Sequence, residues 1–97
     1  MDTNEHEGKP DLLSLASSLE HLATRLEEAE EHHWAAWLRD DASKLRNGIL
    51  YGVEHFLHAF GGMGSINDIS IPFDDPIQKQ LGEAFMAARE LARYYRL

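Results

Sequence analysis

The sequence predicts an all-α domain of four helices with one long loop. The helices are expected at about residues 11–30, 32–47, 49–60 and 76–96, with an extended glycine-rich loop at 61–75. Three observations predict this class. Apolar residues recur at steps of three and four, the period of an α-helix with one buried face. Gly48, Gly61 and Pro76 stand where that period stops or restarts. The composition is globular, with 43% hydrophobic and 27% charged residues.

The chain length supports one domain. With 97 residues it can build one hydrophobic core and has no room for a second. Residues 1–9 lack any hydrophobic period, so we expect a flexible tail there and a single helical domain over residues 10–97.

The first helix has the clearest pattern. Asp11 is the expected N-cap, and leucines then recur at alternating steps of three and four. These leucines are Leu12, Leu15, Leu19, Leu22 and Leu26. One helix over residues 11–46 would be about 54 Å long, which exceeds the width of a compact domain of this size. Because the apolar stripe changes phase near residue 30, we place a turn at 29–32.

The second and third helices are separated by Asn47 and Gly48, which both tolerate the left-handed conformation found at helix ends. The expected buried face of the second helix contains Trp34, Trp37, Leu38, Ala42 and Leu45. That of the third contains Ile49, Val53, Phe56 and Phe60. Gly61 and Gly62 end the third helix.

The segment before the last helix alternates Ile69, Ile71 and Phe73 with polar residues or proline, a pattern of extended chain with one buried side. Since no other segment offers a partner strand, we interpret it as a loop packed on the core. The last helix begins with Asp75 as N-cap and Gln78 at the capping-box position. Its expected buried face contains Ile77, Leu81, Ala84, Phe85, Ala88, Leu91, Ala92 and Tyr95.

Charge and composition exclude several function classes. The formal net charge is −8, and residues 1–47 hold eleven acidic against five basic residues. Nucleic acid binding is not expected, because that affinity comes from lysine and arginine, whereas a basic protein partner fits. No apolar run reaches the roughly 20 residues of a membrane span, so no membrane association is predicted. The chain has no cysteine, which fits a cytoplasmic location.

The sequence predicts no catalytic residues, no cofactor and no metal. No serine stands in a nucleophile elbow, and the adjacent carboxylates Asp40 and Asp41 resemble those of any solvated helix face. His58 could share an ion with Glu54 or His55, but a zinc site needs three or four ligands.

Two groups of residues are candidates for contact with other molecules. The proposed partner-binding group is Trp34, Trp37, Gly61, Gly62, Met63, Gly64, Ser65, Asn67 and Asp68. It combines two tryptophans, which are enriched at interface hot spots, with a flexible methionine between glycines. A second group, Tyr51, His55 and His58, forms a stripe on the third helix that fits a polar cleft.

Two motifs carry a resemblance to a known family. They are His33-Trp34-Ala35-Ala36-Trp37-Leu38 and Phe60-Gly61-Gly62-Met63-Gly64-Ser65-Ile66-Asn67-Asp68. Together they resemble an uncharacterised family of small bacterial proteins, a domain of unknown function, over about residues 11–96. This resemblance implies no activity. In size and acidity the chain is also similar to immunity proteins of bacterial toxin systems, which block a toxin by binding it.

The leading hypothesis is therefore a non-catalytic protein-interaction domain, such as an immunity-type inhibitor that binds a basic protein. One alternative is a small enzyme or ligand-binding domain, in which His55, His58, Asn67 and Asp68 line a cleft beside the glycine loop. Another alternative is a homodimeric structural protein whose apolar helix faces complete each other.

Overall fold

The structure is a computed structural model and describes residues 11–61 and 64–97. Over these residues it is all-helical and contains no β-strand, so the predicted fold class is confirmed. The elements are α2 (Leu12–Glu28), α3 (His32–Arg46), α4 (Tyr51–Leu57), the short 3₁₀ helix η1 (Ile66–Asp68) and α5 (Pro76–Tyr95). None of the helices in these two described ranges has an apolar stretch of the length that a membrane span requires.

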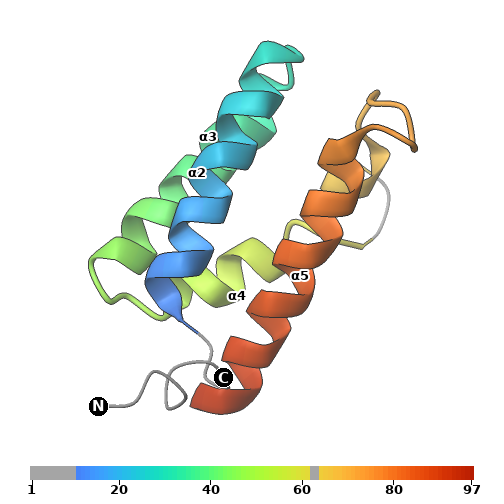
Figure 1. The fold of residues 1–97 in the computed structure, drawn as a ribbon. Coiled ribbons are helices and arrows are strands. Elements are labelled where there is room, and N and C mark those ends of the chain that lie inside the picture. Colours follow the sequence, from blue (N-terminus) through green and yellow to red (C-terminus); the bar gives the residue numbers. More distant parts are fainter. Residues whose placement is uncertain (1–10, 62–63) are drawn as a thin grey trace, which may run out of the picture.

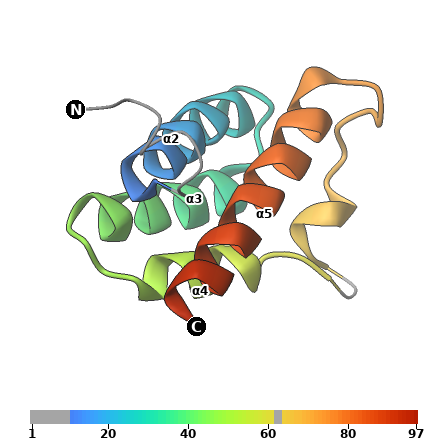
Figure 2. The same ribbon diagram turned by 60° about the horizontal axis from the view of Figure 1, so that its bottom comes forward.

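The helices enclose one core. α2 and α3 lie side by side as an antiparallel hairpin, α4 continues from the end of α3, and α5 runs back across α4 and α2 (Figure 1). The same arrangement viewed from another direction shows η1 beside the first half of α5 (Figure 2). Each of the four helices therefore packs against two others, and their inner faces meet in the middle.

Local signals fix the helix ends as the sequence predicts. The Asp11 carboxylate accepts a hydrogen bond from the Leu13 N–H at 3.0 Å, and Asp75 accepts one from the Ile77 N–H at 2.9 Å. Between α2 and α3 the chain turns at Glu30, whose φ of 64° lies in the left-handed region. Gln78 does not complete the predicted capping box, because the Asp75 N–H from which it would accept donates to the Pro72 carbonyl. The Gln78 side-chain amide donates to the Ile71 carbonyl at 3.0 Å.

The third helix is shorter than predicted. α4 spans residues 51–57 rather than 49–60, and turns follow it from residue 58. Ile49 belongs to the turn before α4 and is 47% exposed, whereas Val53 and Phe56 are fully buried. The contacts of α4 with α3 and α5 thus depend on one face of only two turns.

The core consists mainly of the predicted leucine and alanine faces. Its largest fully buried apolar side chains are Phe56, Leu19, Leu22, Leu26, Leu38, Leu45, Ile66, Leu91 and Val53. Trp34 and Trp37 are half-buried at its edge, and so are Ile69 and Ile71.

Phe73 is the largest departure from the predicted core. The alternating pattern places it on the buried side, but the side chain is 91% exposed. The reason is a turn, in which the Asp75 N–H donates to the Pro72 carbonyl at 3.0 Å just before α5 begins. This turn ends the extended segment before Phe73 reaches the core. Tyr95 is also exposed, at 38%, because it lies in the final turn of α5.

Candidate functional site

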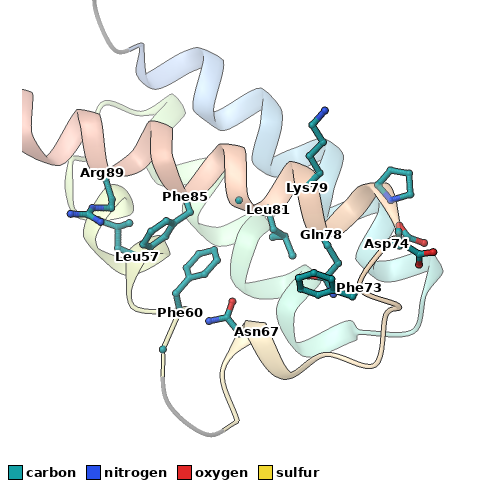
Figure 3. Close-up of a pocket in the computed structure, with 14 residues that line it drawn as sticks. Leu57, Phe60, Asn67, Phe73, Asp74, Gln78, Lys79, Leu81, Phe85 and Arg89 are labelled. Atoms are coloured by element: carbon teal, nitrogen blue, oxygen red, sulfur yellow. The ribbon is translucent and has the colours of Figure 1, made fainter.

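A groove of about 1140 Å³ lies between the end of α4, η1 and the first two thirds of α5. Its α5 side extends from Asp75 to Arg89, and Phe60, Gly61 and Asn67 line the opposite side. Figure 3 shows three phenylalanine rings along this groove, with the Asn67 amide beside one of them. The site is therefore mostly apolar, with a few polar groups at its edges.

The floor of the groove continues from the core. Phe60 packs edge-on against the buried Phe56, with ring centroids 5.2 Å apart. On its other side Phe60 contacts Phe85 of α5, at 4.7 Å. The Arg89 guanidinium lies 5.8 Å from the centre of the Phe85 ring, within the range of a cation–π contact. The Phe60 and Phe85 rings are consequently held in place by neighbours on α4 and α5.

The two ends of the groove carry opposite charges. Asp74 and Asp75 lie at the end where α5 begins, and Arg89 lies at the other end. Lys79 lies one turn further along α5 than Asp75, and its side chain points away from the phenylalanine rings (Figure 3). Asp75 is already engaged as the N-cap of α5, whereas Asp74 is exposed. Phe73 stands beside these carboxylates with almost its whole ring in solvent.

The segment that lines the groove is shaped by its glycines and short polar side chains. Gly61 and Gly64 have φ angles of 92° and 76°, which other residues rarely adopt. The Ser65 hydroxyl accepts a hydrogen bond from the Asn67 N–H, and the Asp68 carboxylate accepts one from the Gly64 N–H at 2.7 Å. Of these predicted partner-binding residues, Gly61 and Asn67 line the groove, and Ser65 and Asp68 hold its wall. The predicted contacts Gly62 and Met63 lie outside the described residues.

A second cluster, the aromatic strip, consists of five rings on α3 and α4: His33, Trp34, Trp37, His55 and Tyr51. Successive centroids are 4.6, 5.1, 4.2 and 5.8 Å apart. The predicted contacts Trp34 and Trp37 therefore lie together with two of the three residues predicted for a polar cleft. The remaining one, His58, is exposed.

Asp41 is the functional candidate that sequence reasoning missed. It is fully buried, and its Oδ1 lies 2.5 Å from Nδ1 of His55. Burial raises the pKa of Asp41 to about 6, although the hydrogen bond and charge of His55 act in the opposite direction. The spacing with Leu38 and Leu45 places Asp41 on the apolar face of α3, and this signal was available in the sequence.

The residues expected in a catalytic cleft are distributed over different places. Asn67 lines the groove, and Asp68 bonds to its own turn. His55 lies in the aromatic strip against Asp41. The groove is accordingly suited to apolar contact, and the polar side chains that line it are those of Asn67, Asp74, Asp75, Gln78, Lys79 and Arg89.

Comparison with known proteins identifies a family. No curated protein and no solved structure matches the chain. The model of the family described as "Domain of unknown function (DUF6966)" matches residues 27–75. This stretch contains α3, α4 and η1, and hence the aromatic strip, Asp41 and the α4 side of the groove. Because the match spans just over half of the chain, the protein belongs to the DUF6966 family, as the resemblance to a domain of unknown function implied.

Proposed function

We propose that this protein is a non-catalytic protein-interaction domain whose groove receives an amphipathic helix of a basic partner protein. The observation that carries this proposal is Phe73, 91% exposed at the edge of an apolar groove. Large aromatic side chains are typical anchors at protein interfaces, where a partner removes them from water. Exposure of such a ring beside an apolar cavity indicates a surface that a partner covers.

The dimensions of the groove fit a helix. Its α5 wall runs from Asp75 to Arg89, fourteen residue steps or about 21 Å along the helix axis. A partner helix of roughly fourteen residues has the same length and presents apolar anchors at steps of three and four. Those anchors would contact Phe60 and Phe85 on the floor and Phe73 at the edge.

Charge supports both a basic partner and one orientation of its helix in the groove. The net charge of −8 favours encounter with a positively charged protein. Within the groove, the exposed Asp74 complements the positive N-terminal end of a helix dipole, and Arg89 complements the negative C-terminal end. The partner helix then begins near Asp74 and ends near Arg89. An inhibitor that blocks a basic toxin by binding it is one role that needs no more than such a surface.

The experiment uses a synthetic fourteen-residue peptide with leucine on one helical face and lysine on the other. Backbone amide NMR spectra of the protein are recorded during titration with this peptide and with a scrambled peptide of equal charge. We expect shifts of the Phe73, Gly82 and Phe85 amides with the amphipathic peptide and smaller, unlocalised shifts with the scrambled one.

Two variants test the site without disturbing the core. A Cβ at Gly82 meets nothing within 4 Å, so Gly82→Lys adds a charged chain to the groove wall at no packing cost. Phe73→Ala removes the exposed ring. Both should weaken peptide binding at least tenfold, and Trp34→Ala in the aromatic strip should not. Amide shifts confined to the aromatic strip would contradict the proposal. Light scattering that shows a wild-type dimer and a monomeric Phe73→Ala variant would also contradict it, because a second copy of the chain would then occupy the groove.

A further inference from the structure

We propose that Asp40, Asp41 and His55 form a binding site for a divalent transition-metal cation at the junction of α3 and α4. Each residue offers one ligand atom, and the three atoms lie within 4.8 Å of one another. This site is separate from the groove and is made by residues that the protein-binding proposal does not use.

The ligands are held by the packing of the two helices. A Cβ on Gly52 would lie 3.1 Å from the Asp41 carbonyl oxygen, so glycine at this position lets α4 approach α3 closely. The Trp37 ring stacks on the His55 ring, and its indole N–H donates to the His55 carbonyl at 3.1 Å. The imidazole is therefore oriented before any cation binds, which reduces the ordering that binding requires.

The buried carboxylate points independently to a ligand. Asp41 is fully buried, and its Oδ1 contacts the His55 ring. Its Oδ2 is equally buried and has no hydrogen-bond partner among the described residues. Buried polar atoms are nearly always satisfied in folded proteins, and a carboxylate without a full set of partners is unfavourable in a low-dielectric interior. A bound cation would neutralise this carboxylate.

The donor set selects the class of cation. Two carboxylates and one imidazole suit zinc and its first-row neighbours, and three protein ligands are typical of zinc sites that keep one position for water. The Asp40 side chain is 57% exposed, which gives the ion a path from solvent. Lys44 pairs with Asp40 and would have to move aside, but an ion pair with such an exposed carboxylate contributes little to stability.

The test is titration of the full chain with Zn²⁺ at pH 7, measured by isothermal titration calorimetry. We expect saturable binding of one ion, weakened about tenfold or more by Asp40→Asn and by His55→Gln. His58→Gln is the matched control, because His58 lies on the same stretch of chain, is exposed, and is not part of the cluster. Its affinity should equal that of the unaltered protein.

Asp40→Asn keeps the test decisive even if His55→Gln fails to fold, since Asp40 is exposed. Histidine ring spectra provide a second measurement, in which Zn²⁺ should shift the His55 signals first. The proposal is overturned if no saturable binding occurs, if Asp40→Asn binds as tightly as the unaltered protein, or if the first shifts fall on His32 and His33.

Discussion

Trp37 and His55 stack ring on ring, with centroids 4.2 Å apart and planes inclined by 12°, although they are eighteen positions apart in the chain. The Trp37 indole N–H also donates to the His55 carbonyl oxygen at 3.1 Å. One side chain of α3 thus contacts both the ring and the backbone of α4. This pair fixes the junction on which both the aromatic strip and the Asp41 contact depend.

Replacing Trp37 with phenylalanine should destabilise the fold. The variant keeps an aromatic ring but loses the indole donor and part of the stacked area, and the His55 carbonyl loses a partner. We expect a decrease of about 1–2 kcal/mol in the free energy of unfolding, the usual cost of one part-buried hydrogen bond and its packing. Urea denaturation monitored by circular dichroism measures this decrease. Fluorescence is not used, because the substitution itself changes it.

Trp34→Phe is the matched control. Trp34 is also half-buried, and its ring centroid lies 5.1 Å from that of Trp37. Its effect should be clearly smaller, since no inter-helix hydrogen bond of Trp34 is seen among the described residues. Equal losses in the two variants would show that ring area alone matters at this junction.

Two glycine-to-alanine substitutions should change the stability of the fold in opposite directions. In Gly52→Ala the new Cβ would lie 3.1 Å from the Asp41 carbonyl oxygen, the Leu45 side chain and the Lys44 Cβ. Backbone and packed side chains have little room to shift, so we expect a loss of about 1–3 kcal/mol. In Gly82→Ala the Cβ meets nothing within 4 Å, and the better helix former should add about 0.5–1 kcal/mol. Thermal unfolding of the pair checks both signs, and two stabilised variants would mean that α4 does not approach α3 this closely.

Features with local causes could be predicted from the sequence, and those with tertiary causes could not. Asp11 and Asp75 begin α2 and α5 as predicted, because a cap depends only on the next two or three residues. The Asp41 to His55 contact joins two helices, and no spacing within either helix indicates it. The prediction that Phe73 is buried is wrong for a related reason. Alternation shows which residues share a side, but not where a turn ends the extended chain.

Substitution of two phenylalanines should affect stability very differently, because one ring lies in the core and the other on the surface. Phe56 is fully buried, and Phe56→Ala should cost about 3–5 kcal/mol. Phe73 is 91% exposed, and Phe73→Ala should stay within about 0.5 kcal/mol of the unaltered protein. Urea midpoints of the two variants test this directly. A loss of several kcal/mol for Phe73→Ala would mean that the ring packs on the fold in solution and is not available to a partner.

Lowering the pH should weaken the contact between Glu20 of α2 and Arg46 of α3, because Glu20 becomes protonated. The Arg46 guanidinium donates to both carboxylate oxygens of Glu20, at 2.6 and 2.7 Å, and this hydrogen bonding holds the pKa of Glu20 below its ordinary value of 4.5. Because the folded-state pKa is lowered, the unfolded chain binds the proton more readily. The pair therefore stabilises the fold fully above pH 4.5, and this stabilisation is lost as the pH falls through the lowered pKa.

Arg46→Met isolates this effect, since it keeps an unbranched apolar stem and removes the guanidinium. The difference in melting temperature between the unaltered protein and the variant should be present at pH 6 to 7 and should shrink below about pH 4.5. Both side chains are more than 40% exposed, so the difference should also shrink in about 1 M salt. A difference that stays constant with pH and salt would assign the contribution of Arg46 to packing of its stem, because packing depends on neither the charge of Glu20 nor its screening.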